Sequence, residues 1–145
     1  SALCAKSGVP CVSAGGKSNI YRLLRERPEG EILVIADGAA FGAEMAYVTS
    51  LTRFKKIRLF LPESFEWLVL SSSLFDDVGT REMLLHPSDH IESSEFFSWE
   101  QFFTKELIEK TSGSYLAYSK RGLNEVYLHP LEFNAIAEEL PELGI

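Results

Sequence analysis

The segment Glu31-Ile-Leu-Val-Ile-Ala-Asp37-Gly-Ala-Ala-Phe-Gly42 is the clearest indication of the fold class. It is an apolar run that ends in one carboxylate and passes at once into small residues. A parallel strand covered on both faces has this near-continuous apolar pattern, and ligands and metals bind at the carboxyl ends of such strands. The stretch therefore predicts a buried parallel strand that delivers Asp37 to the mouth of an α/β sheet.

The neighbouring segments predict the same class. Short apolar runs predict strands at 9–13 and 57–61, on either side of the strand at 32–36. The spacing of apolar residues predicts helices at 19–27 and 41–51, and a further short helix follows the third strand. Strands that alternate with helices over short connections favour parallel pairing. We therefore expect a three-layer, Rossmann-like α/β sandwich around a mainly parallel central sheet.

The second half has a different character. Residues 71–95 are polar and interrupted, Ser98-Trp-Glu-Gln101 fits a capping box, and Pro130 opens a last helix. We expect one domain over 1–145, with an α/β core at 1–70 and a mainly helical C-terminal extension at 71–145. Because the chain opens with what resembles the end of a helix, we also expect it to be part of a longer protein.

Composition excludes several classes of protein. The chain has 145 residues, of which 46% are hydrophobic and 24% charged, as in an ordinary globular domain. No apolar run approaches the ~20 residues that cross a bilayer, so no membrane partner is expected. Cys4 and Cys11 form neither a disulfide framework nor a zinc motif. We interpret them as reduced, buried thiols of a cytoplasmic protein.

The net charge of −7 is unevenly distributed. Residues 1–70 contain nine Lys/Arg and seven Asp/Glu, whereas residues 71–145 contain five and fourteen. This balance argues against nucleic-acid binding by the whole surface. A local basic strip remains in the first half. It is either a binding surface or, as is commoner, a set of solvated helix ends: Lys17, Arg22, Arg25, Arg27, Arg53, Lys55, Lys56 and Arg58.

The turn Gly15-Gly16-Lys17-Ser18 lies between a predicted strand and a predicted helix. Backbone amides and the helix dipole at such a turn are suited to an anion. The spacing of a nucleotide-binding P-loop is absent, because Cys11 occupies the place of its first glycine. Two interpretations stay open, an anion-binding turn and a glycine turn needed for backbone reasons alone.

Acidic residues near the predicted strand ends are candidates for a metal site. Asp37 either binds Mg²⁺, directly or through water, or caps the helix that follows. A second carboxylate is expected two residues on, where the chain has Ala39. Glu44 lies one turn into the next helix and is placed to point back toward the mouth. Glu63 and Glu66 follow the third strand, where they either face the same mouth or form an ordinary exposed helix start.

Three segments resemble the TOPRIM-like domains of the OLD-type nucleases, which follow ABC-type ATPase domains in bacterial defence and repair proteins. The segments are Cys11-Val-Ser-Ala-Gly-Gly-Lys-Ser-Asn-Ile20, Ile32-Leu-Val-Ile-Ala-Asp-Gly38 and Leu61-Pro-Glu-Ser-Phe-Glu-Trp-Leu68. The resemblance covers residues 8–70. By position, Asp37 matches the first aspartate of the family's Asp-x-Asp pair and Glu66 matches its later glutamate.

The resemblance implies Mg²⁺-assisted phosphodiester chemistry, with two departures. Ala39 stands in place of the second aspartate, and residues 1–12 contain no Asp or Glu to match the glutamate that opens the family's pattern. We therefore expect a degenerate domain that binds nucleic acid, a partner or its own ATPase domain, with no catalytic residue assigned. Its phosphate-binding turn would be residues 15–18, and its metal candidates Asp37, Glu66 and Glu44.

Two alternatives stay open. One is an active Mg²⁺-dependent nuclease, completed by a glutamate that precedes Ser1. The other is an interaction domain without catalysis, in which the acidic second half docks a basic partner. Its aromatic residues are more often core than interface in such a pattern: Phe96, Phe97, Trp99, Phe102 and Phe103.

Overall fold

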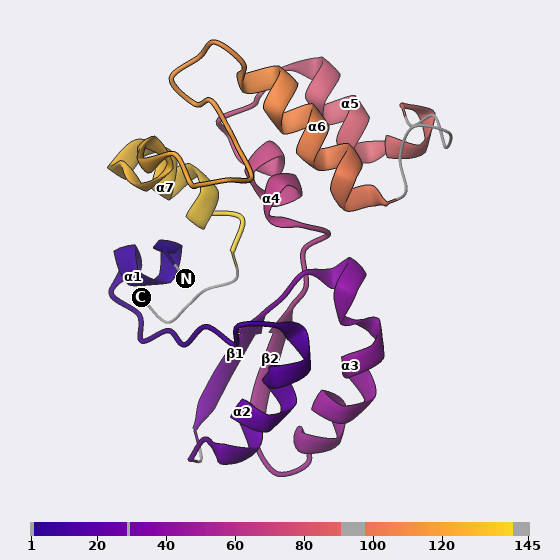
Figure 1. Ribbon diagram of the computed structural model, residues 1–145, viewed down its shortest axis with the longest axis vertical. Coiled ribbons are helices and arrows are strands. Elements are labelled where there is room, and N and C mark those ends of the chain that lie inside the picture. Colours follow the sequence, from indigo (N-terminus) through magenta and orange to yellow (C-terminus); the bar gives the residue numbers. More distant parts are fainter. Residues whose placement is uncertain (1, 29, 91–97, 141–145) are drawn as a thin grey trace. The chain divides into compact units, whose positions relative to one another are not determined.

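The computed structural model describes residues 2–28, 30–90 and 98–140 (Figure 1). The chain divides into two compact units, of which the first, unit 1, ends at Pro62 and the second, unit 2, begins at Glu63. In the described residues, the strands lie in unit 1 and unit 2 is helical. The predicted α/β class is thus confirmed. No helix among these residues is both long enough and apolar enough to cross a membrane.

Unit 1 contains a two-stranded parallel sheet. β1 (Glu31–Ile35) pairs with β2 (Lys56–Phe60), so that Glu31 is opposite Lys56 and Ile35 is opposite Phe60. A parallel pair needs a crossover connection, and α3 (Gly38–Leu51) supplies it. Three short helices precede β1: α1 (Ala2–Ser7), η1 (Lys17–Asn19) and α2 (Ile20–Glu26). The strands predicted at 32–36 and 57–61 and the helices predicted at 19–27 and 41–51 are therefore present.

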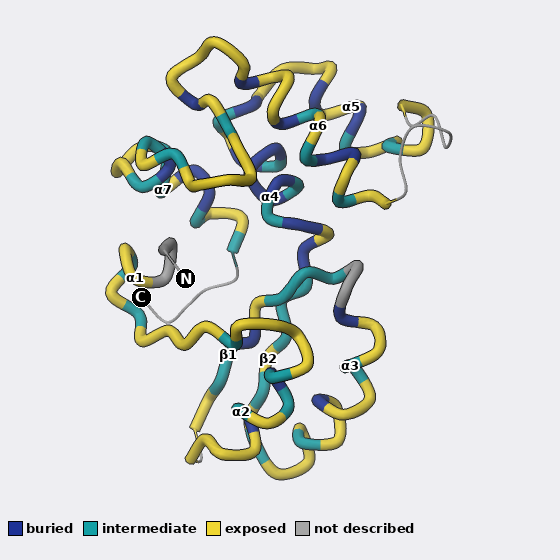
Figure 2. The backbone as a smooth tube through the Cα atoms, viewed as in Figure 1, coloured by how far each residue is buried: buried dark blue, intermediate teal, exposed yellow. Residues whose placement is uncertain are grey.

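The core of unit 1 lies between the sheet and two helices. α2 contributes Ile20 and Leu24, α3 contributes Phe41 and Val48, and β1 contributes Val34 to one buried cluster. Figure 2 shows the inner sides of these helices as buried and their outer sides as exposed. The described part of unit 1 thus has helices against one side of a small sheet, and a three-layer sandwich is not shown.

The other side of the sheet is only partly covered. Side chains alternate along a strand, so Leu33, Ile35 and Phe60 point away from the cluster around Val34. Leu33 and Phe60 are half-buried, and Ile35 is 40% exposed. The prediction that both faces of this strand are covered is therefore wrong at Ile35.

The predicted strand at 9–13 is absent. Pro10 has no amide hydrogen to donate to a ladder, Val9 is only half-buried, and Val12 is 54% exposed. An apolar run without a fully buried side chain gains little from strand pairing. Cys11, in the same segment, is a free and exposed thiol, which corrects the prediction that it is buried. The side chain of Cys4 lies outside the described residues.

Unit 2 is built around α4 (Phe65–Ser71), whose Leu68, Val69 and Leu70 are all buried. The elements that follow it are α5 (Val78–Leu85), η2 (Pro87–Asp89), α6 (Trp99–Thr111), η3 (Glu125–Leu128) and α7 (Pro130–Ala137). The helix starts predicted at Ser98 and Pro130 are confirmed, and α4 is the short helix expected after the strand at 57–61. Ser64 accepts a hydrogen bond from the Trp67 amide at 3.1 Å, and Ser98 accepts one from the Gln101 amide at 3.3 Å.

Candidate functional site

A pocket of about 400 Å³ lies at the carboxyl end of β1 in unit 1. We call it the carboxyl-end pocket, and its lining is Ser13, Ala14, Gly15, Gly16, Lys17, Ile20, Ile35, Ala36 and Asp37. It brings together two features that the sequence predicted separately, the glycine turn and the strand-end aspartate. Positive and negative groups thus line one hollow, at the end of the sheet where α/β folds bind ligands.

The glycine turn has a backbone that other residues rarely adopt. Gly15 has φ 68° and Gly16 has φ 156°, so both positions favour glycine. The Gly15 amide donates to Ser13 Oγ at 3.3 Å, and Asn19 Nδ2 donates to the Ala14 carbonyl at 3.1 Å. Since Asn19 turns backward in this way, its side chain does not cap α2. The partial positive charge at the start of α2 is therefore not offset by that residue.

Asp37 is held in place by the backbone on either side of it. The Ala36 amide donates to the Phe60 carbonyl at 3.2 Å, and the Gly38 amide donates to the Pro62 carbonyl at 2.7 Å. Asp37 directly precedes α3, where a negative charge is favourable to the helix dipole. Asp37 lines the pocket, where a metal ligand is expected, and directly precedes α3, where a helix cap is expected. Both predicted roles therefore stay open.

Two other predicted site residues lie apart from this pocket. Ser18 is exposed on η1 and is not among the residues that line the pocket. Glu44 is half-buried in the second turn of α3 and does not line it either. Within unit 1, the candidate site thus consists of the glycine turn through Lys17, together with Asp37.

Glu66 belongs to unit 2 and is buried, with 3% of its surface exposed. It accepts a hydrogen bond from the Tyr118 hydroxyl at 2.7 Å, and Lys120 Nζ lies 3.3 Å from the same oxygen. Lys120 also donates to Glu100 at 2.5 Å. The Glu66 carboxylate therefore ties α4 to the segment that carries Tyr118 and Lys120.

These contacts control the protonation of Glu66. Burial raises the pKa of Glu66, but the Tyr118 hydrogen bond and the charge of Lys120 outweigh it and hold the pKa below its usual 4.5. Burial and the bond to Glu66 raise the pKa of Tyr118. Glu66 is thus an ionised carboxylate with two partners in unit 2. Glu63, by contrast, is exposed, so the plain interpretation of a solvated helix start fits Glu63 alone.

The carboxyl-end pocket offers a Mg²⁺ ion one protein carboxylate, fewer than the pair expected from the sequence. Mg²⁺ sites usually combine one or two carboxylates with water and phosphate oxygens. Across residues 2–28, 30–90 and 98–140, no three His, Cys, Asp or Glu side chains form a group that suits a metal. The carboxyl-end pocket contains one carboxylate, Asp37, and Glu66 is engaged by Tyr118 and Lys120.

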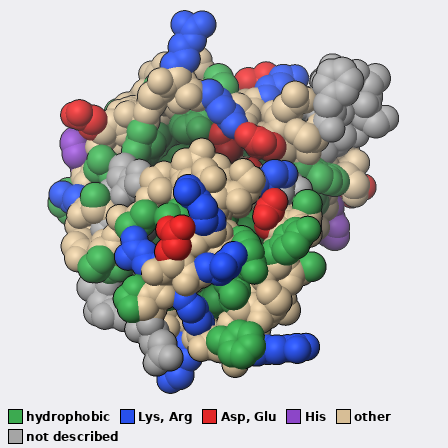
Figure 3. All heavy atoms as spheres, turned by 60° about the horizontal axis from the view of Figure 1, so that its bottom comes forward, with side chains coloured by type: hydrophobic (Ala, Val, Ile, Leu, Met, Phe, Trp, Pro, Cys, Tyr) green, Lys and Arg blue, Asp and Glu red, His purple; other side chains and the backbone are tan. Residues whose placement is uncertain are grey.

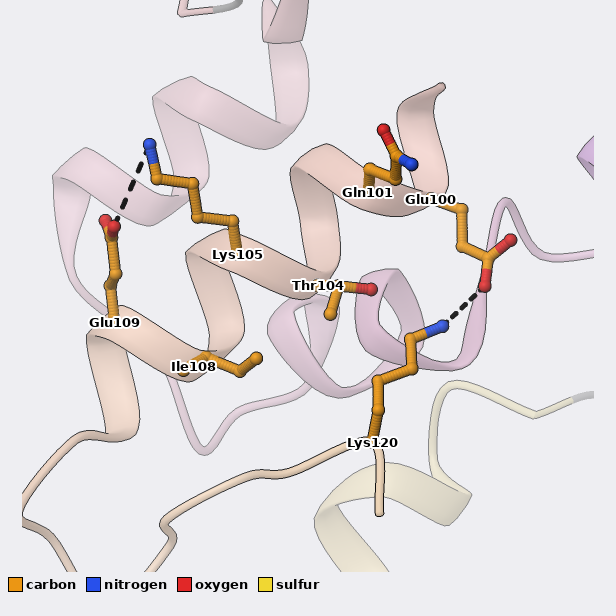
Figure 4. Close-up of a pocket in the computed structure, with 7 residues that line it drawn as sticks. All are labelled: Glu100, Gln101, Thr104, Lys105, Ile108, Glu109 and Lys120. Atoms are coloured by element: carbon orange, nitrogen blue, oxygen red, sulfur yellow. Dashed lines mark hydrogen bonds and ion pairs between the residues drawn. The ribbon is translucent and has the colours of Figure 1, made fainter. Parts of the chain in front are cut away.

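A second hollow, of about 330 Å³, runs along α6 in unit 2 (Figure 4). Figure 4 shows two ion pairs beside it, Lys105 with Glu109 at 3.8 Å and Lys120 with Glu100 at 2.5 Å. Thr104 Oγ1 is buried in this wall without a hydrogen-bond partner among the described residues. Because its cations face carboxylates, this hollow has no net preference for an anion, and sequence reasoning did not find it.

The aromatic residues of unit 2 are mainly structural. Phe102 and Phe103 are buried in the core, as the pattern favoured. Trp99 is partly exposed and stacks on Phe103, with 6.3 Å between ring centroids. Phe96 and Phe97 lie outside the described residues.

No protein-family model, curated protein or solved structure matches this chain.

Proposed function

We propose that this chain is a degenerate TOPRIM-like module of an ATPase-linked protein, which binds phosphate groups of nucleic acid without cleaving them. The proposal includes the larger three-layer fold of that family, of which β1 and β2 would be the parallel pair that carries the site. The observation that best supports the proposed function is that one pocket is lined by Gly15, Gly16, Lys17 and Asp37.

Phosphate is the ligand that this set of groups favours. A glycine turn before a helix offers backbone amides, and an adjacent lysine adds a full positive charge. Residues 1–62 carry nine Lys/Arg and five Asp/Glu, so the unit around the pocket attracts anions even though the whole chain is acidic. Asp37 opposes an anion placed directly against it, so the phosphate is expected on the side of Lys17.

The loss of cleavage follows from the shortage of carboxylates. Metal-assisted phosphodiester hydrolysis needs ions clamped on the attacking and leaving oxygens. Ala39 supplies no ligand, and the Glu66 carboxylate already has Tyr118 and Lys120 as partners. One aspartate at a strand end is too few ligands for this chemistry.

Phosphate binding is tested by NMR titration of ¹⁵N-labelled protein with inorganic phosphate and with a 5′-phosphorylated dinucleotide. We expect the largest shifts at the amides of Gly15, Gly16 and Lys17. Lys17→Ala is expected to weaken binding about tenfold, the usual scale of one hydrogen bond to a charged group. Lys105→Ala removes the same charge from unit 2 and should have no effect. Shifts centred elsewhere, or equal binding by Lys17→Ala, would contradict the proposal.

The absence of cleavage is tested on supercoiled plasmid with Mg²⁺ or Mn²⁺. We expect no nicking above the level of protein-free controls. Nicking that Asp37→Ala abolishes would instead support the alternative, an active nuclease with a further glutamate outside these 145 residues.

A second candidate, docking of a basic partner on unit 2, is favoured by charge and exposure. Residues 63–141 carry five Lys/Arg and fifteen Asp/Glu. α5 exposes Val78 and Leu85, and Leu131 is exposed on α7. Co-purification of a partner that resists nuclease treatment, and is lost with Val78→Ser/Leu85→Ser, would support this function. Loss of the partner on nuclease treatment would contradict it.

A further inference from the structure

Unit 1 gathers positive charge at the amino ends of its strands, away from the carboxyl-end pocket. The last turn of α2 and the segment after it carry Arg25 and Arg27. The turn between α3 and β2 carries Arg53, and Lys56 begins β2; all four side chains are exposed. Residues 21–31 and 52–58 together contain seven Lys/Arg and three Asp/Glu. Figure 3, which brings the bottom of Figure 1 forward, shows Lys and Arg side chains spread over this end, with apolar side chains between them.

Lys55 fixes the two basic segments side by side. Its Nζ donates to the carbonyl oxygens of Leu24 at 2.6 Å, Arg25 at 3.1 Å and Arg27 at 2.5 Å. A cation at this place satisfies the free carbonyls at the end of α2 and is favourable to its dipole. Lys55 is therefore structural, and its bonds hold the cations of both segments in one surface. The carbonyl contacts account for Lys55, whereas the cations around it remain exposed.

Carboxylates offset only part of this charge. Glu31 lies 3.3 Å from Arg58, and both are exposed at the edge of the paired strands. Glu26 is exposed in the last turn of α2. With every acidic residue counted, residues 21–31 and 52–58 together carry an excess of four positive charges.

Aromatic side chains are exposed among these cations. Phe54 is 79% exposed and lies between Arg53 and Lys55 in the chain. On the adjoining helices, Tyr47 is 59% exposed and its ring lies 5.8 Å from that of Tyr21. Arg25 lies over the Tyr21 ring at 5.8 Å. Unpaired bases stack on exposed aromatic rings that lie between basic side chains.

We propose that this surface, the basic end (Arg25, Arg27, Arg53, Phe54 and Lys56), binds single-stranded nucleic acid. The cations contact successive phosphates, and Phe54 stacks on a base. A duplex keeps its bases paired and stacked, so it offers no free face to Phe54. The inference goes beyond the proposed function, because it names the strand state and uses none of the residues of the carboxyl-end pocket.

The test is fluorescence anisotropy with labelled oligothymidylate, with oligouridylate and with a DNA duplex of equal length. Single strands are expected to bind more tightly than the duplex, and the two single strands distinguish DNA from RNA. Arg27→Glu/Lys56→Glu is expected to lose about tenfold or more in affinity and to flatten the salt dependence, since each phosphate contact adds about 0.7 to the log–log slope. Lys105→Glu/Arg121→Glu makes the same charge change on unit 2 and should bind nearly as wild type.

Phe54 gives an independent readout. Phe54→Ala is expected to lose about fivefold or more in affinity with an unchanged salt slope, because stacking involves no counterions. Phe54→Trp should keep the affinity of the wild type. Circular dichroism of each variant confirms that the helices are retained.

Three outcomes would overturn the inference. Equal losses in both double-charge variants would show an effect of net charge alone. Duplex binding that equals single-strand binding and ignores Phe54→Ala would exclude base stacking. Salt-sensitive self-association that Arg27→Glu/Lys56→Glu abolishes, without oligonucleotide binding, would identify the acidic unit of a second copy as the occupant. Arg27→Glu/Lys56→Glu also separates the proposals, because neither residue lines the carboxyl-end pocket and the shifts that inorganic phosphate causes at Gly16 and Lys17 should persist in this variant.

Discussion

A Cβ added at Gly38 would lie 2.8 Å from the Leu61 carbonyl oxygen and 3.1 Å from that of Pro62. Both contacts are to backbone, which has little freedom to yield. We therefore expect Gly38→Ala to destabilise the protein by roughly 1–3 kcal/mol, the scale of overpacking. Urea unfolding followed by circular dichroism measures the change.

The matched control is Gly42→Ala, also in α3, where nothing lies within 4 Å of the added carbon. Removal of a glycine from an exposed helix position should stabilise by roughly 0.5–1 kcal/mol. If both variants were equally stable, the close approach that positions Asp37 would not exist.

Glu66 gives a prediction about pH. Its folded pKa is below the ordinary 4.5, so its contribution to stability is complete above about pH 4.5 and is lost as the pH falls through the folded pKa. Glu66→Gln is expected to cost roughly 1–3 kcal/mol at pH 7, because the partners Tyr118 and Lys120 lose a charged acceptor. The difference from wild type should shrink in acid.

Urea unfolding of both proteins from pH 7 to pH 3 checks this, with Glu63→Gln as the exposed control. A difference that stays constant over that range would show that the charge of Glu66 is not what stabilises the wild type.

The site residues that sequence reasoning located are those with local patterns. Asp37 ends an apolar run, and Gly15 and Gly16 stand between two elements, so a short window reveals each. The role of Glu66 depends on Tyr118, which is 52 residues away in the chain. No spacing rule connects such a pair, because only packing of α4 against later segments brings them together.

The end of α2 depends on a single lysine from another element. Lys55 Nζ donates to three carbonyl oxygens of that helix end. Lys55→Met keeps most of the aliphatic stem and removes the donors, and we expect it to destabilise unit 1 by roughly 1–2 kcal/mol. Faster hydrogen exchange at the amides of α2 would accompany the loss.

Lys56→Met is the control for this change, since Lys56 is the neighbouring exposed lysine. It should alter stability by less than about 0.5 kcal/mol. Equal effects of the two substitutions would mean that general charge, and not the carbonyl contacts, accounts for the result.

Elements were predictable where apolar runs have a buried side. β1 and β2 lie within one or two residues of their predicted ranges, because both are compact apolar runs between turns. The helix α5 was missed, since it exposes Val78 and Leu85 and buries only Thr80 and Met83. Its clearest signal is the cap, where Asp77 Oδ2 accepts from the Thr80 amide at 3.0 Å. The strand predicted at 9–13 is absent for the opposite reason, because its apolar residues have no core to pack against.

The two units differ in net charge and in secondary structure. Residues 1–62 have an excess of four positive charges, and residues 63–141 an excess of ten negative charges. A net charge of −7 therefore conceals one unit with an excess of positive charge. The alternation of predicted strands and helices indicated the α/β class, but it does not determine how many layers surround a sheet, because that depends on which faces of the sheet are covered.

We propose that the carboxyl-end pocket binds phosphate without a metal ion. Calorimetric titration of the protein with a 5′-phosphorylated dinucleotide in EDTA is the decisive test. We predict that binding persists in EDTA, is unchanged by Mg²⁺, and is weakened about tenfold by Lys17→Ala. Binding that occurs only with Mg²⁺ and disappears with Asp37→Ala would contradict the account and show a metal site at the end of β1.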